Sequence, residues 1–267
     1  MQYFTFTVDD NIRFLRDVTA WSKDGHVALF DHPYLAMWKR LHDAYGVKIQ
    51  LNLFYESEDF DLSRASARYR PEFEACADWL HLSFHSKKEF PAHPYKTSGY
   101  KALFCDCQAV HREIVRFAGE QSLARTTTVH YAETTGKGVR ALRDCGMRGL
   151  LGLFGTEDAP RTSYDVSMKD AAMIRQGFPQ RIDGMWHFPI SGVLNLLSLE
   201  QIGPAMDAIR EHPFVGLMIH EQYFYEDYPR FQADFEEKVI RAVGKLCEAG
   251  RISCFAEELC EDTRTWN

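Results

Sequence analysis

Two adjacent carboxylates and three histidines in this sequence each close a short stretch rich in apolar and β-branched residues. Two imidazoles and one carboxylate form a good Zn²⁺ site with room for water, and the same ligands suit Fe²⁺, Mn²⁺, Co²⁺ or Ni²⁺. The carboxylate and the histidine left over have the chemistry of a general base and a general acid. The five residues are Asp9, Asp10, His85, His130 and His220.

The carboxylate pair also has a purely structural interpretation. Asp10 and Asn11 precede a helical pattern over 12–21, where a polar side chain would cap a helix. Taken alone, the pair favours capping, and the histidines at three other strand ends reverse that preference. Because side chains alternate along a strand, we expect Asp9 and Asp10 to point to opposite faces and to do different jobs.

Strand patterns alternate with helical patterns along most of the chain. This alternation predicts stacked βα units, a mainly parallel sheet and an α/β barrel, in which the carboxyl ends of the strands meet at one face. Expected strands cover 1–10, 47–54, 78–85, 125–129, 148–154, 214–220 and 252–255, with weaker ones at 164–168 and 185–190. Expected helices cover 12–21, 31–45, 71–77, 99–118, 137–144, 198–211 and 231–249.

Composition limits the class of protein. With 267 residues, 45% hydrophobic residues and no obvious linker, we expect one domain over 1–267. A net charge of −7 argues against a nucleic-acid partner. The sequence contains no apolar stretch of about 18 residues that would predict a membrane span, and its N-terminus lacks a signal-peptide pattern. We therefore expect a cytoplasmic protein. Its seven cysteines are expected to be reduced thiols.

The segment 7–11, Thr-Val-Asp-Asp-Asn, resembles the first motif of the polysaccharide deacetylases, usually Thr-Phe-Asp-Asp-Gly. These are metal-dependent enzymes that remove acetyl groups from sugars. The resemblance implies a distorted or incomplete (β/α) barrel of about seven mainly parallel strands. It also implies that Asp9 is the catalytic base and Asp10 a metal ligand.

The second motif of that family, His-Ser/Thr-x-x-His-Pro, is similar to His85-Ser and His93-Pro, although the two histidines here lie eight positions apart instead of four. His130 ends the strand where the third motif would offer an Arg, so His130 and His93 compete as the third metal ligand. The preference falls on His130. His81 precedes His85 by four residues on an extended strand and is expected to be a core residue.

The segment 217–221, Leu-Met-Ile-His-Glu, resembles the final Leu-x-His motif. The resemblance implies that His220 is the general acid, with Glu221 beside it to orient the imidazole. Tyr131, Trp186 and Tyr223 are candidate platforms for a sugar ring.

The sequence therefore predicts a metal-dependent hydrolase, with Zn²⁺ as the first choice of metal, that removes an acetyl group from a carbohydrate or related small molecule. Two alternatives stay open. One is a metal-dependent amidase acting on an amide that is not a sugar. The other is a catalytically silent barrel that binds a carbohydrate or a protein partner.

Overall fold

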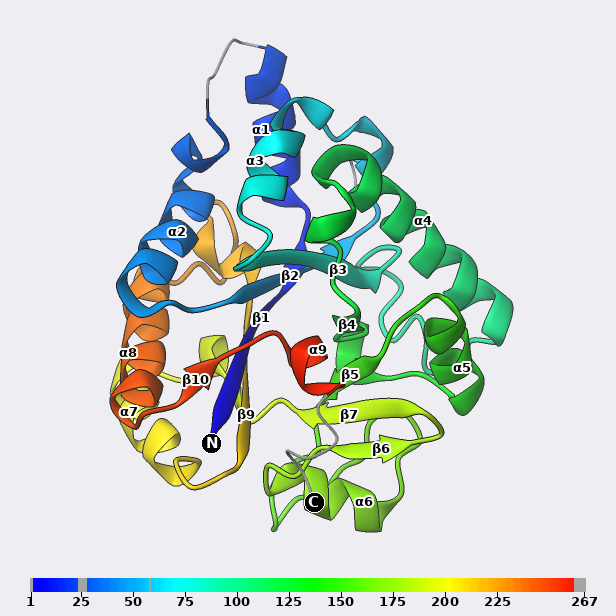
Figure 1. Ribbon diagram of the computed structural model, residues 1–267, viewed down its shortest axis with the longest axis vertical. Coiled ribbons are helices and arrows are strands. Elements are labelled where there is room, and N and C mark those ends of the chain that lie inside the picture. Colours follow the sequence, from blue (N-terminus) through cyan, green and yellow to red (C-terminus); the bar gives the residue numbers. More distant parts are fainter. Residues whose placement is uncertain (1, 24–27, 58, 262–267) are drawn as a thin grey trace.

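The computed structural model describes residues 2–23, 28–57 and 59–261, and its strands form two sheets that curve around a common interior (Figure 1). Met1, the first residue of the expected opening strand, lies outside the described residues. The larger sheet has the order β3-β2-β1-β9-β8, with β10 also paired to β1. Its strands are β1 (Tyr3–Asn11), β2 (Ile49–Phe54), β3 (Leu80–Ser86), β8 (Gly192–Val193), β9 (Phe214–His220) and β10 (Ile252–Ser253).

The smaller sheet has the order β4-β5-β7-β6, and only the β6–β7 pair among the described strands is antiparallel. The ring of strands is not closed, so the expectation of an incomplete, mainly parallel barrel is confirmed. The strands are β4 (Thr126–Thr127), β5 (Gly149–Gly152), β6 (Gln180–Ile182) and β7 (Met185–Pro189).

Helices cover the outside of this barrel: α2 and α8 pack together on one side, and α4 and α5 pack together on the other (Figure 1). No helix among the described residues is long and apolar enough to cross a membrane. The helices are α1 (Arg13–Lys23), α2 (Pro33–Tyr45), α3 (Arg70–Ala75), α4 (Tyr100–Ala118), α5 (Gly136–Asp144), α6 (Met168–Arg175), α7 (Leu199–Ala208), α8 (Phe235–Glu248) and α9 (Ala256–Leu259).

Strand β1 lies between β2 and β9 and is buried from Phe4 to Asn11. A parallel strand covered on both faces can hold apolar residues on both, which explains why Phe4, Phe6 and Val8 are fully buried beside buried threonines. Its last residues reach the carboxyl end of the barrel in register with β9, where Asp9 pairs with His220. The arrangement places the opening strand at the centre of the candidate site.

One expected strand is wrong. Residues 164–167 form a turn and a short connection into α6, which begins at Met168, and Tyr164 and Asp165 have φ values of 61° and 56° in the left-handed region. The alternation of buried and exposed side chains over 164–167 imitates a strand. The helix expected from position 231 begins at Phe235, because two turns occupy the residues before it.

Candidate active site

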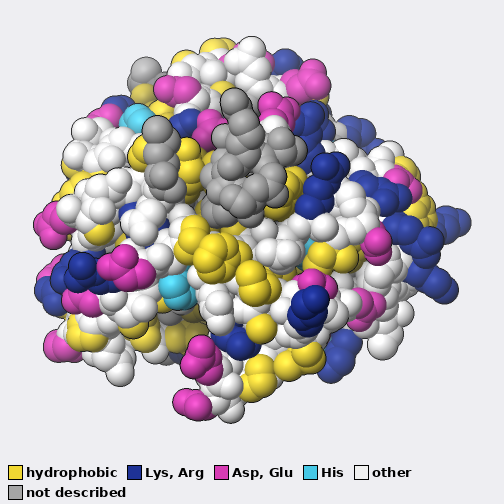
Figure 2. Space-filling view, turned by 60° about the horizontal axis from the view of Figure 1, so that its bottom comes forward, with side chains coloured by type: hydrophobic (Ala, Val, Ile, Leu, Met, Phe, Trp, Pro, Cys, Tyr) yellow, Lys and Arg dark blue, Asp and Glu magenta, His cyan; other side chains and the backbone are white. Residues whose placement is uncertain are grey.

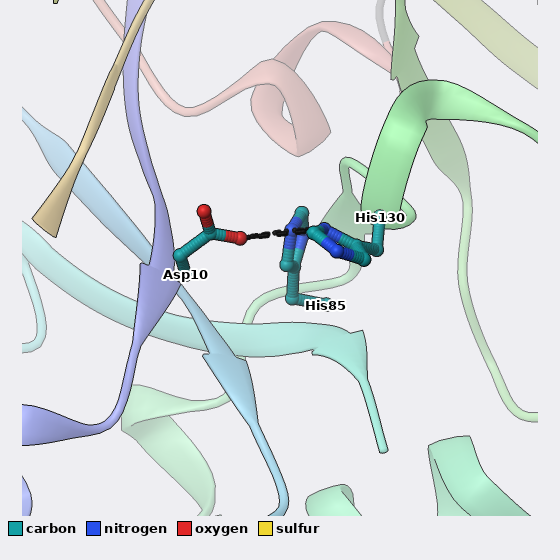
Figure 3. A group of neighbouring side chains, drawn as sticks. All are labelled: Asp10, His85 and His130. Atoms are coloured by element: carbon teal, nitrogen blue, oxygen red, sulfur yellow. Dashed lines mark hydrogen bonds and ion pairs between the residues drawn. The ribbon is translucent and has the colours of Figure 1, made fainter. Parts of the chain in front are cut away.

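Asp10, His85 and His130 lie together at the carboxyl ends of their strands, and one ligand atom from each lies within 4.8 Å of the others (Figure 3). His85 Nε2 is 3.0 Å from Asp10 Oδ1 and 3.0 Å from His130 Nδ1. His130 Nδ1 is 3.3 Å from the same carboxylate oxygen. All three side chains are buried, so water does not compensate for their polar atoms.

The contact made by His85 Nδ1 shows which ring nitrogen of His85 carries the proton. His85 Nδ1 lies 2.5 Å from the carbonyl oxygen of Thr128, which can only accept a hydrogen bond. A neutral His85 therefore carries its proton on Nδ1 and presents a lone pair at Nε2. That lone pair and the Asp10 carboxylate converge on the same point as His130 Nδ1. Such a convergence of acceptors is satisfied by a cation, and two imidazoles with one carboxylate fit a divalent metal.

The carbonyl bond of His85 is also the kind of outer contact that fixes a metal-binding imidazole. His130 lacks such a contact, because its Nε2 has no hydrogen-bond partner within the described chain. Its ring instead packs edge-on against Phe54, with the ring centroids 5.1 Å apart. Packing therefore orients the third residue of the cluster.

Asp9 and Asp10 both reach His85, contrary to the expectation that they point to opposite faces. Asp9 Oδ2 is 3.9 Å from His85 Nδ1, and Asp10 Oδ1 is 3.0 Å from His85 Nε2. The reason is a break in the strand: Asp10 has φ +62°, and the register with β2 shifts between Val8 and Asn11. A bulge of this kind redirects a side chain, and Asp tolerates the left-handed conformation better than most residues.

The two carboxylates have opposite electrostatic environments. Burial raises the pKa of Asp9 well above its ordinary value, although a hydrogen bond from Asn52 Nδ2 at 2.6 Å acts in the other direction. Burial also raises the pKa of Asp10, but contacts with His130 and His85 outweigh it and hold that pKa well below the ordinary value. Asp10 is thus suited to stay charged as a ligand, while Asp9 is suited to accept a proton.

His220 lies beside Asp9 at the end of β9, and its Nδ1 is 2.8 Å from Asn195 Oδ1. The amide oxygen accepts the Nδ1 proton, which leaves Nε2 free to exchange a proton in the cavity. Burial is the main cause of the lowered pKa of His220, and the charge of Asp10 opposes it. Asn195 therefore has the orienting role that the sequence assigned to Glu221.

Glu221 is turned away from His220, and the prediction that it orients the imidazole is wrong. Its carboxylate accepts hydrogen bonds from the backbone N–H groups of Ile12, Arg13 and Phe14 at 2.7, 2.9 and 2.8 Å. These are unpaired donors at the start of α1, so Glu221 caps that helix from the far end of the sequence. The alternative that Asp10 caps the helix is not what the structure shows.

A cavity of about 600 Å³ opens over the cluster and is lined by Asp9, Asp10, His85, His130 and His220 among others. Tyr131, which is 37% exposed, and Tyr223, which is 9% exposed, also line it. Both tyrosines therefore remain candidate platforms for a substrate.

His93 lines the same cavity but lies apart from the metal-type cluster. Its Nδ1 is 2.9 Å from Glu133 Oε2, and its ring lies 4.0 Å from the ring of Tyr131. Of the two competing third ligands, His130 is the one that the fold brings to Asp10 and His85.

Trp186 is not placed to contact a substrate, so that expectation is corrected. It is 8% exposed and packs near Phe188, and its Nε1 donates to the carbonyl of Cys260 at 3.1 Å. Its partner in the sheet is Gly149, the first residue of β5, whereas the candidate site lies at the carboxyl ends of the strands. The sequence pattern of a strand does not show at which end of the sheet an aromatic residue will lie.

Two residues of the site have no motif in the sequence. Gln222 Nε2 donates to the second oxygen of Asp10 at 2.8 Å, and Asn195 holds His220. Gln222 lies two positions after His220, so proximity in sequence was a usable signal. Asn195 lies between two leucines in an irregular segment and carried no such signal.

No protein-family model matches this chain, and no curated protein matches its sequence. Solved structures do match. A carbohydrate deacetylase is 11% identical with a TM-score of 0.56, covering 98% of this chain and 53% of the other, so the chain spans about half of that protein. A family 4 acetyl xylan esterase from Clostridium thermocellum, in complex with cobalt, is 12% identical with a TM-score of 0.52. The match covers 97% of this chain and 90% of the esterase.

A family 4 carbohydrate esterase from Streptomyces lividans, in complex with acetate, is 13% identical with a TM-score of 0.51 and covers 95% of this chain and 92% of its own. These likenesses define the class of fold. The chain has the incomplete (β/α) barrel of the family 4 carbohydrate esterases and deacetylases, and the predicted resemblance is confirmed at the level of the fold.

Proposed function

We propose that this protein is a divalent-metal-dependent deacetylase that releases acetate from an acetylated carbohydrate. One observation carries the proposal: acceptor atoms of Asp10, His85 and His130 converge beside a buried carboxylate with a raised pKa. The proteins of like fold add support, since they are described as deacetylases and esterases of carbohydrates.

Asp10, His85 and His130 would hold the metal, and Zn²⁺ is our first choice among Zn²⁺, Fe²⁺, Co²⁺, Mn²⁺ and Ni²⁺. A bound divalent cation would polarise the acetyl carbonyl and lower the pKa of water in the site toward about 7. The ligand set leaves positions open for water and substrate, as catalytic sites require.

Asp9 accepts the proton of the attacking water. Its burial keeps the carboxyl group basic enough for this step, and the hydrogen bond from Asn52 fixes one oxygen while the other faces His85. His220, protonated at both ring nitrogens, donates its Nε2 proton to the departing amine or alcohol while its Nδ1–H stays bound to Asn195. The proton that Asp9 took from water returns to His220 before the next turnover, so the protons balance. The sugar lies in the cavity against Tyr131 and Tyr223.

The test is acetate release from a panel of N-acetylated and O-acetylated oligosaccharides and of small amides, after chelation and reloading with each metal. We expect acetate release that depends on added metal. Asp9→Asn should keep the bound metal and lower kcat by about 10²- to 10⁴-fold, because it removes the base alone. Asp61→Asn, on an exposed loop, is the matched control.

Turnover of amides that carry no acetyl group, with no acetate released from any sugar, would favour the amidase. A chain that takes up no metal and cleaves nothing on the panel would be a binding barrel. Unchanged kcat in Asp9→Asn would contradict the assignment of the base.

A further inference from the structure

A second cavity, of about 670 Å³, lies on the outer side of the smaller sheet. Helix α5, the turn at Tyr164–Asp165 and the β6–β7 hairpin enclose it, and it shares no lining residue with the cavity over Asp10. Its volume is within the range of about 300 to 1,000 Å³ that is typical of sites for small molecules. It is therefore large enough for a ligand of its own.

Cationic side chains form one edge of this outer cavity. Lys137, Arg140 and Arg143 follow one another at three-residue intervals on α5 and so lie on one side of the helix. Within the described chain, Lys137 and Arg140 make no ion pair, and Arg143 contacts Asp144 at 3.7 Å. Lys and Arg side chains gather at the right of Figure 2, the side on which α5 lies in Figure 1. A chain of net charge −7 thus concentrates positive charge here.

The floor of the outer cavity holds a buried imidazole. His187 is 2% exposed, and its Nδ1 has no hydrogen-bond partner in the described part of the chain. Burial lowers the pKa of His187 to about 4, so the ring is neutral near pH 7. The Nδ1 atom is sealed from solvent, so the ring contributes a neutral packing surface to the floor of the cavity. Apolar side chains of Val166 and Ile182 and the ring of Tyr164 complete the walls.

Two carboxylates also line the outer cavity, and they restrict what it accepts. Asp165 Oδ2 accepts from the N–H of Gly136 at 2.7 Å, so the first turn of α5 is already capped and an anion must bind to side chains instead. Asp183 lies at the hairpin, where its backbone oxygen accepts from Arg143. The free carboxylate oxygens can accept hydrogen bonds from hydroxyl or amine groups of a ligand, and they repel a ligand that carries several anionic groups.

We propose that the outer cavity binds a small organic molecule with one anionic oxygen group, a phosphate or a carboxylate. The anionic group contacts Lys137 and Arg140, whose forked and flexible cations suit phosphate and carboxylate oxygens. The rest of the molecule lies against His187 and the apolar walls. This site is independent of the deacetylase proposal, because no residue is common to the two cavities.

Calorimetric titration with inorganic phosphate and, separately, with acetate at constant ionic strength tests the proposal and distinguishes the two anions. We expect one of them to bind, and Arg140→Gln to weaken that binding about tenfold or more, because a charge-assisted hydrogen bond is lost. Arg112→Gln, an exposed arginine on α4, is the control and should bind as the parent protein does. Failure of both anions to bind, or equal binding by Arg140→Gln, overturns the proposal.

Nuclear magnetic resonance of the imidazole nitrogens gives a second readout. The bound anion should shift the His187 signals and leave those of His111 unchanged, since His111 is also buried but lies on α4 and does not line the outer cavity. His187→Phe should weaken binding while the protein keeps its parental metal content. Anion-dependent shifts at His111 of the same size as those at His187 would mean that the anion binds elsewhere.

Discussion

Replacement of Asp10 by Asn tests the role of the carboxylate as a metal ligand without disturbing the backbone conformation at this position. Asp10 has φ +62°, a conformation that Asn also tolerates, so Asp10→Asn removes the negative charge and leaves the bulge intact. A metal present at 1,000 times its Kd stabilises the parent protein by about 4 kcal/mol. For a chain of this size that corresponds to a rise in Tm of about 8 to 16 °C. We expect the rise to disappear in Asp10→Asn.

The assay is differential scanning calorimetry of chelated protein before and after addition of metal, with metal content measured on the same samples. Asp10→Ala should also lose the metal-dependent rise, and in addition it destabilises the metal-free protein, because the left-handed conformation costs Ala about 1 kcal/mol. Its metal-free Tm should lie about 2 to 4 °C below that of Asp10→Asn. Asp43→Asn, an exposed carboxylate on α2, is the control. If Asp10→Asn keeps the full metal-dependent rise, Asp10 is not a ligand and the site is wrongly built.

Asn195→Ala should lower kcat by about 100-fold with metal content unchanged, because His220 loses its orienting partner. Asn195→Asp keeps a hydrogen-bond acceptor and should keep most of the activity. Steady-state kinetics of the two variants measure the difference. Burial of His111 lowers its pKa from 6.5 to about 4, so the unfolded chain takes up the proton first and stability is lost as the pH falls through that window. The loss is about 3 kcal/mol, and urea unfolding at pH 7 and pH 4 should show a smaller difference in His111→Gln. Gly216→Ala would place a Cβ 2.1 Å from the carbonyl oxygen of Pro189, where the two sheets meet, and should destabilise the fold by at least about 1 to 3 kcal/mol in the same assay.

The carboxyl ends of the strands were predictable, because a buried parallel strand ends where its apolar run ends. Asp9, His85 and His220 were located in this way, and the fold brought them together as the parallel barrel requires. The third residue of the cluster was harder. His130 and His93 both had a basis in the sequence, and only the path of the chain after β4 decides between them.

What the sequence could not supply depends on single backbone angles and on contacts between distant segments. No glycine marks the bulge at Asp10 in the sequence, so strict alternation predicted that Asp9 and Asp10 point to opposite faces. Glu221 follows His220 directly, yet three N–H groups more than 200 positions earlier hold it. Asn195 reaches the site from an irregular segment. Local periodicity contains none of this information.

The third residue of the cluster, His130, comes from the turn after β4, so the cluster does not depend on the loop between β3 and α4. The loop of residues 87–99, between β3 and α4, contributes no member of the cluster, since His93 is tied to Glu133 at the rim. Apart from Tyr95, which is buried against Phe84, the residues of this loop can change while the cluster of Asp10, His85 and His130 persists. Sequence changes in this loop, natural or engineered, can therefore alter this edge of the cavity and leave the cluster of Asp10, His85 and His130 in place.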